Sequence, residues 1–313
     1  MRELIYGLLL IVFMRFRPQG LWGEHRATVG EVERRRASAA GRGAGAEVPL
    51  AERIAGRGVG QGRPVLELSG VTKQFGGIRA LWNLSLMLPE GSITGLIGPN
   101  GAGKTTAFNV ITGFLPPDTG TVRYRGRDIT GLSPYRVARL GIARSFQDLR
   151  LFQRMTVLDN VLVARPSPLG ESAARALAGG AAVRRAEARD LDAALASLEF
   201  VELADKAGEV AENLSYAEQK LLALARLLAT EADVLLLDEP TSGLAPTTVE
   251  AMLEIVRRLP ERGKTVCIIE HNLDVIRGLS DRVAFLDSGE AIADGTPDAI
   301  MADPRLADLY FGR

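Results

Sequence analysis

The chain has 313 residues, of which 46% are hydrophobic and 24% are charged, and its 38 basic residues balance its 38 acidic residues. This composition is typical of a soluble globular protein with one large or two small domains, and the zero net charge gives no overall field that favours nucleic acid or an anionic membrane. One cysteine, Cys267, excludes an internal disulfide and indicates a reducing compartment, and two histidines exclude a histidine-rich metal site. The apolar flanks of Cys267 predict a small buried hydrophobe.

The first 23 residues form an apolar segment that differs from the rest of the chain. As a helix, the unbroken apolar run from Leu4 to Met14 would reach ~16 Å, against a hydrocarbon core of ~30 Å, so it does not span a membrane alone. Arg2 before the run is compatible with a secretory signal, but Arg15 and Arg17 follow at once and no cleavage site of small residues is present. A helix that packs on the domain is the remaining alternative.

Residues 24–63 are rich in glycine, alanine and arginine and contain scarcely any aromatic or long aliphatic runs. Such a segment buries too little apolar area to offset the entropy of ordering it. We therefore expect a flexible linker here.

From residue 64 to residue 313 the pattern is that of an α/β domain with antiparallel strands at its front. Strands are predicted at 65–71, 85–88, 92–97, 234–238 and 265–270, a strand-turn-strand unit at 121–129, and helices at 217–229 and 248–259. The sequence from about 148 to 230 is mostly helical in pattern, rich in alanine and charged residues, which predicts a helical insertion into the α/β body.

The stretch "GLIGPNGAGKTT" contains the pattern G-x-x-x-x-G-K-[ST], between a predicted strand and a predicted helix. Its glycines let the backbone wrap a phosphate, the helix N-terminus adds a partial positive charge, Lys104 reaches the β- and γ-phosphates, and the Thr105 hydroxyl can ligate Mg²⁺. The flanking strand and helix disfavour the alternative of a glycine-rich turn with an incidental lysine. The residues expected to contact nucleotide are Gly98, Pro99, Asn100, Gly101, Ala102, Gly103, Lys104, Thr105 and Thr106.

Two acidic residues, Asp238 and Glu239, follow a continuous apolar strand. A carboxylate at that position can hold Mg²⁺ through water, and Asp238 is assigned this role. Because side chains alternate along a strand, Glu239 points elsewhere and can activate a water for attack on the γ-phosphate. A solvated Asp-Glu-Pro turn is the alternative, which the preceding apolar run makes the weaker one.

Five motifs in this order resemble the nucleotide-binding subunit of an ABC transporter, over roughly Val65 to the C-terminus. They are "GPNGAGKTT", "FQ" at 146–147, "LSYAEQ" at 214–219, "LLLDEPTSGLAP" and "IIEH". The resemblance implies a P-loop NTPase cassette, ATP and Mg²⁺ as ligands, and a helical subdomain between the "FQ" and signature motifs. It also implies a head-to-tail dimer with two ATP molecules between the subunits.

The same resemblance implies roles for residues outside the glycine-rich loop. Phe75 would stack on adenine, Gln147 would sense Mg²⁺ and the membrane partner, and His271 would hold the γ-phosphate beside Glu239. Ser215 and the backbone after it would contact the nucleotide that a second subunit binds. Phe75 could instead be a core aromatic, and His271 an ordinary strand-end residue. Ser215 also begins a good helix capping box, which is compatible with its role because a capped helix N-terminus would face the phosphate.

The signature departs from the family's usual Leu-Ser-Gly-Gly-Gln. Tyr216 and Ala217 replace both glycines and Glu218 replaces the glutamine, which adds a Cβ and a negative charge close to nucleotide. Weaker contact across the dimer or slower turnover is therefore a hypothesis. Ala245 stands where many relatives carry Asp or Asn, which puts cross-talk between subunits at that position in doubt.

Further segments resemble the ATPases of branched-chain (hydrophobic) amino acid uptake, with urea uptake and lipopolysaccharide export as alternatives. They are "ARSFQDLRLFQRMTVLDNVLVA", "IIEHNLDVI" and "GTPDAIMADPRLADLYFG", and residues 1–23 resemble the C-terminal end of the permease of such a system. The resemblance implies an ATPase on the cytoplasmic side of the inner membrane, bound to permease subunits and to an identical or paralogous ATPase, without nucleic acid. A regulatory nucleotide binder that does not hydrolyse ATP is the alternative from a different class.

Overall fold

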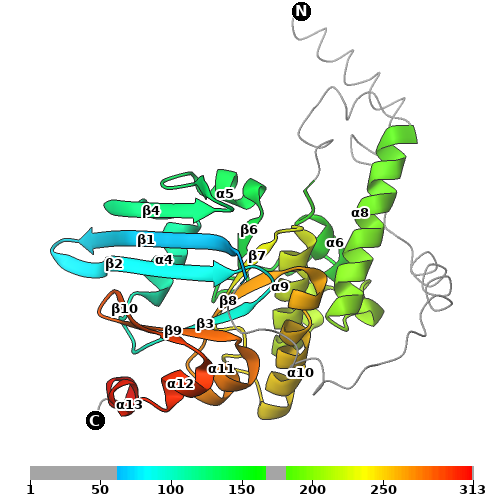
Figure 1. Cartoon of the computed structure of the whole chain (residues 1–313). Coiled ribbons are helices and arrows are strands. Elements are labelled where there is room, and N and C mark those ends of the chain that lie inside the picture. The colour runs from blue at the N-terminus through cyan, green and yellow to red at the C-terminus, as the bar shows by residue number, and fades with distance from the viewer. Residues whose placement is uncertain (1–61, 167–180, 312–313) are drawn as a thin grey trace, which may run out of the picture. The chain divides into compact units, whose positions relative to one another are not determined.

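Two β-sheets and the helices around them make up the described part of the chain, residues 62–166 and 181–311 of a computed structural model (Figure 1). These residues belong to one structural unit, Arg57–Arg313. The apolar segment predicted at 1–23 and the linker predicted at 24–63, up to residue 61, lie outside the described residues.

The first sheet has four strands in the order β2-β1-β4-β5, and all of its pairs are antiparallel. Its strands are β1 (Pro64–Phe75), β2 (Ile78–Pro89), β4 (Thr119–Tyr124) and β5 (Arg127–Asp128). Buried Leu66 and Leu68 alternate with the more exposed Glu67 and Ser69, so one face of this sheet packs on the core. The predicted antiparallel front of the domain is confirmed.

The second sheet has six strands in the order β10-β9-β3-β8-β7-β6. They are β3 (Ile93–Ile97), β6 (Ile142–Arg144), β7 (Val234–Asp238), β8 (Thr265–Ile269), β9 (Arg282–Asp287) and β10 (Glu290–Gly295). Only β10 pairs antiparallel; the other pairs are parallel. Since parallel strands end at the same edge, the glycine-rich loop after β3 and the acidic pair at the end of β7 reach one side of the sheet.

The helices of the described ranges are of two kinds. The α-helices are α4 (Lys104–Ile111), α5 (Pro134–Leu140), α6 (Val157–Leu162), α8 (Ala181–Phe200), α9 (Tyr216–Ala229), α10 (Pro246–Arg257), α11 (Leu273–Leu279), α12 (Pro297–Met301) and α13 (Pro304–Phe311). Short 3₁₀ helices lie at η1 (Ala204–Lys206), η2 (Ala211–Asn213) and η3 (Pro260–Arg262). Helices α6, α8 and α9 pack against one another on the side away from the β1–β2 hairpin, which is the helical subdomain of the predicted fold class (Figure 1).

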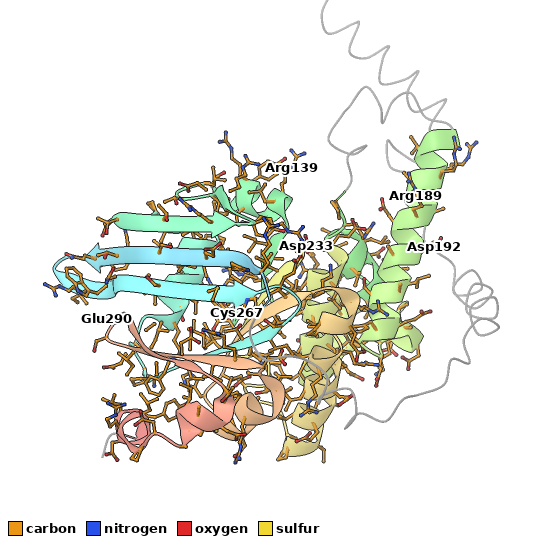
Figure 2. The ribbon with its side chains drawn as sticks, in the orientation of Figure 1. Arg139, Arg189, Asp192, Asp233, Cys267 and Glu290 are labelled. Atoms are coloured by element: carbon orange, nitrogen blue, oxygen red, sulfur yellow. The ribbon has the colours of Figure 1, made fainter. Side chains whose placement is uncertain are left out.

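One apolar core joins the two sheets through α4. Phe108 of α4 is fully buried and belongs to the same cluster as Leu66 of the first sheet and Leu236 of the second. Cys267 lies in β8 inside this cluster, well away from the outline of the molecule in Figure 2, which confirms its prediction as a buried hydrophobe. Burial raises the pKa of the Cys267 thiol well above its ordinary value, so it stays protonated.

Candidate nucleotide site

The glycine-rich loop connects β3 to α4 and leaves the start of that helix without a side-chain cap. The N-cap residue is Gly103, in the left-handed region with φ 100°, and no side chain in the described part of the chain caps it. A Cβ at Gly103 would lie 2.4 Å from the carbonyl oxygen of Ala80, so only glycine fits. The first N–H groups of a helix have no partner within it, and this arrangement leaves them to an anion.

Lys104, the first residue of α4, lies folded against its own loop. Its side chain is buried, and its ammonium group donates to the carbonyl oxygens of Gly98, at 2.7 Å, and Pro99, at 2.9 Å. Burial lowers the pKa of Lys104, while the nearby carboxylates of Glu239 and Asp238 act in the opposite direction. The Lys104 ammonium group is therefore held against Gly98 and Pro99 of the loop, near the acidic pair at the end of β7.

Asp238 ends β7 and is paired with an arginine that our sequence analysis did not single out. The Arg144 guanidinium donates to the Asp238 carboxylate at 2.6 Å, and both side chains are buried. Arg144 also donates to the side-chain oxygen of Asn109 on α4, and the Asp238 backbone N–H donates to the Ser145 hydroxyl at 2.9 Å. This network ties together β6, β7 and α4. The missed signal was the charge that ends the short strand "IAR", because a buried guanidinium requires a partner.

Glu239, Gln147 and His271, the three predicted catalytic residues, meet at the carboxyl ends of the strands. His271 Nε2 lies 2.9 Å from one oxygen of the Glu239 carboxylate, and the Gln147 amide donates to the other at 3.3 Å. The Glu239 backbone has φ 49°, an uncommon conformation for a residue other than glycine. The Tyr310 hydroxyl donates to the His271 carbonyl oxygen at 2.6 Å and fixes this backbone from α13.

The signature segment begins α9 with a closed capping box. The Ser215 hydroxyl accepts from the Glu218 backbone N–H, and the Glu218 carboxylate accepts from the Ser215 backbone N–H at 2.8 Å, so the predicted box is confirmed. The Ser215 hydroxyl also lies 2.8 Å from that carboxylate. Neither residue hydrogen bonds to the glycine-rich loop within the described residues, so the structure does not bring this segment to the other predicted phosphate contacts.

Lys206, a second residue that sequence analysis missed, neutralises Glu218. Its ammonium group lies 2.7 Å from the Glu218 carboxylate. The hydrogen bond from Lys206 is the main reason that the pKa of Glu218 is lowered, and the same bond raises the pKa of Lys206. The negative charge that Glu218 adds to the signature is therefore paired within the chain. Nothing local in the sequence links η1 to α9, so no signal could have found this pair.

Phe75 ends β1 and is exposed over 44% of its surface, which excludes the alternative of a core aromatic. Its ring faces solvent beside the Lys73 ammonium group, 5.6 Å from the ring centroid. An exposed ring at a strand end offers a flat apolar face for a base.

This arrangement of a glycine-rich loop, paired acids and a strand-end histidine on a parallel sheet defines a nucleoside triphosphatase of the ATP-binding cassette class. The sequence profile of the ABC transporter family matches residues 81–242. The chain is similar to a crystal structure of the ADP conformation of MJ1267, an ATP-binding cassette of an ABC transporter, with 32% identity, a TM-score of 0.70, and coverage of 80% of this chain and 100% of that one. A nucleotide-free cassette gives a TM-score of 0.70 at 33% identity, with the same coverage of both chains.

Relatives of known function identify a branch within the ATP-binding cassette class. The chain is 40% identical to the high-affinity branched-chain amino acid transport ATP-binding protein LivG of Salmonella typhimurium, over 80% of this chain and 98% of that protein. It is 39% identical to BraF of Pseudomonas aeruginosa, with the same coverage. The chain belongs to the ABC transporter family as an ATP-hydrolysing, ATP-binding subunit, in the branch that contains LivG and BraF. No helix in the described ranges combines the length and apolar character needed to cross a bilayer.

Proposed function

We propose that this chain binds ATP through the glycine-rich loop, hydrolyses it with Glu239, and powers the import of branched-chain or other hydrophobic amino acids. One observation carries the hydrolytic part of the proposal. The Glu239 carboxylate is held between Gln147 and His271, at the sheet edge that it shares with Lys104. The names of the LivG and BraF relatives support the substrate class.

The residues at this edge fit a magnesium nucleotide. The backbone approach at Gly103 leaves no room for a Cβ, and the Lys104 charge at the loop mouth suits phosphate oxygens. The Thr105 hydroxyl, the Gln147 amide oxygen and the Asp238 carboxylate are the oxygen ligands that would hold Mg²⁺. Bound Mg²⁺ supplies neutralisation of the charge that develops on the phosphates.

Each predicted site residue has a distinct task in this proposal. Glu239 takes a proton from the attacking water, and His271 and Gln147 fix the direction of its carboxylate. Phe75 offers its exposed ring to the adenine. Ser215, with the backbone at Ala217 and Glu218, faces the nucleotide of a second subunit, so two sites form between two cassettes.

The partners follow from this arrangement. We propose a second cassette, identical or paralogous, and transmembrane permease subunits that hold the chain at the cytoplasmic face of the inner membrane. Nucleic acid is not among the proposed partners, and the equal numbers of acidic and basic residues agree with this.

Comparison of the purified chain with its Glu239→Gln variant tests hydrolysis. We expect the variant to retain magnesium-dependent ATP binding and to lose roughly 10²–10⁴-fold in the rate of phosphate release. Nucleotide binding without phosphate release from either protein would favour a regulatory nucleotide binder instead, and equal measurable rates would contradict the role of Glu239. Uptake of labelled leucine, compared with labelled urea, in cells that produce the chain with its permease tests the substrate class. Urea uptake or lipopolysaccharide export without leucine uptake would contradict it.

A further inference from the structure

A buried lysine on α9 holds the backbone around Glu239. Lys220 is 7% exposed, and its ammonium group donates to the carbonyl oxygens of Glu239 and Pro240, each at 3.1 Å. Burial lowers the pKa of Lys220, while the carboxylates of Glu270 and Glu239 act in the opposite direction. Burying an ammonium group costs free energy unless it is hydrogen bonded. The two carbonyl oxygens of Glu239 and Pro240 offset this cost at Lys220.

Tyr216 lies one turn before Lys220 on the same face of α9, and its ring lies beside Gly243. A Cβ at Gly243 would lie 3.1 Å from a ring carbon of Tyr216, and Gly243 has φ 75°. The Lys220 ammonium group lies 5.5 Å from the centroid of the Tyr216 ring. Residues four apart share a helix face, so Tyr216 and Lys220 together contact the segment from Glu239 to Gly243 at both ends.

The segment from Glu239 to Gly243 is fixed on its other side by the sheet. The Glu239 backbone N–H donates to the Ile269 carbonyl oxygen at 2.9 Å. Buried Glu270 accepts from the Thr241 backbone N–H at 2.9 Å and from the Thr241 hydroxyl at 2.6 Å. Tyr216 and Lys220 therefore connect this segment to α9, whose N-cap is Ser215.

We propose that Lys220 is a positioning residue, which with Tyr216 maintains the positive-φ conformation of Glu239 and so couples the start of α9 to the catalytic carboxylate. A shift of Ser215 when a second subunit engages it moves the Lys220 ammonium group, and with it the Glu239 carbonyl. The hydrolytic site then responds to the partner without any direct contact between partner and Glu239. This inference rests on the proposed role of Glu239.

The test compares buried Lys220 with half-buried Lys264, which makes the same kind of contact. Lys264 also donates to two backbone carbonyl oxygens, those of Glu231 at 3.3 Å and Ala232 at 2.7 Å, and burial likewise lowers its pKa. Lys220→Met and the matched control Lys264→Met therefore remove equivalent charges and hydrogen bonds. Only Lys220 contacts the segment that carries Glu239.

We expect Lys220→Met to lower kcat by roughly 10–100-fold, since misplacing a catalytic group by about 1 Å costs up to this much. KM for ATP and the affinity for magnesium ADP should stay within about two-fold, Lys220→Arg should restore most of kcat, and Lys264→Met should leave kcat unchanged. In a Glu239→Gln background, Lys220→Met should add no further loss, because both changes act through one group.

Equal kcat values for Lys220→Met and Lys264→Met would overturn the inference, as would a full further loss in the Glu239→Gln background. If Lys220→Met does not fold, Tyr216→Ala provides the second variant, with a loss of kcat at unchanged KM as the expected result and an unchanged kcat as the contradicting one. Failure of the proposed function is distinguishable, because wild type and Glu239→Gln would then hydrolyse ATP equally.

Discussion

Helices α4 and α9 both begin at residues predicted to face a phosphate, but their first turns are built in opposite ways. At α4 the N-cap is Gly103, and no side chain of the described residues caps it. At α9 the N-cap is Ser215, which exchanges hydrogen bonds with Glu218, while Lys206 pairs with the same carboxylate. The first helix leaves its backbone donors to a ligand, and the second uses part of its own.

This difference separates a preformed site from one that must rearrange. The first backbone N–H groups of α4 need give up no side-chain cap to accept phosphate, although the Lys104 ammonium group must share or release its bonds to the Gly98 and Pro99 carbonyl oxygens. For the Ser215 hydroxyl to meet a phosphate across the dimer, it must give up a 2.8 Å contact with the Glu218 carboxylate. We therefore expect changes at α4 to weaken nucleotide binding as well as turnover, and changes at α9 to act on turnover alone.

Of the changes that test this comparison of α4 with α9, Lys104→Ala should have the largest effect. Loss of a charge held at the loop mouth removes direct phosphate stabilisation, so kcat should fall by roughly 10²–10³-fold and nucleotide affinity should weaken as well. Phosphate release and the binding of a fluorescent ATP analogue measure the two effects, with circular dichroism as the control for folding. An unchanged affinity would show that α4 does not hold the nucleotide.

The next effect concerns the close approach at Gly103. Gly103→Ala introduces a Cβ 2.4 Å from the Ala80 carbonyl oxygen at φ 100°, and we expect a loss of about 1–3 kcal/mol in the free energy of unfolding. Gly101→Ala is the matched control, because Gly101 has φ 83° but no heavy atom within 4 Å of its Cβ position. Urea unfolding measures both. Equal losses would mean that backbone strain, and not close approach, dictates glycine at Gly103.

A smaller effect should follow from opening the capping box at α9. The double variant Ala217→Gly, Glu218→Gln restores the residue types usual in the family, removes the charge that engages the Ser215 hydroxyl, and should raise kcat several-fold. The lost charged contact should cost less than about 1 kcal/mol in the free energy of unfolding. Steady-state ATPase rates at saturating ATP measure the first effect. An ATPase rate equal to wild type would contradict the hypothesis that this box slows turnover.

The smallest effect is a dependence of stability on pH at the same box. Lys206 lowers the pKa of Glu218, so the stabilisation from this carboxylate is present above its unfolded value of 4.5 and is lost as pH falls through the lower folded value. The pKa of Lys206 is raised, so its contribution persists below its unfolded value of 10.5 and is lost only at higher pH. Urea unfolding between about pH 3 and pH 6 should show less acid-induced loss for Lys206→Met than for wild type. The same decrease in the free energy of unfolding for both proteins below pH 6 would contradict the pairing of Lys206 with Glu218.

Sequence patterns predicted the strands of both sheets, because the apolar pattern of a strand is set by residues that are neighbours in the chain. The run Val234–Asp238 is buried throughout, and the strand predicted at 65–71 lies within β1 of the antiparallel sheet. The capping box was equally visible, since its two residues are three apart. The glycine spacing of the loop likewise predicted glycine at Gly103, where the backbone lies against the Ala80 carbonyl oxygen.

The amino-acid sequence by itself predicted the α/β fold class, the glycine-rich loop and the acidic pair Asp238 and Glu239, because each depends on local spacing, while the role of His271 came from the family resemblance of its motif. Only the tertiary structure decided the partners of these groups. Arg144 reaches Asp238 because β6 pairs with β7, and Lys220 reaches the Glu239 backbone because α9 packs beside the end of β7. Charge pairs between distant segments leave no periodic trace in a sequence, since the order of strands and the packing of helices fix their distances.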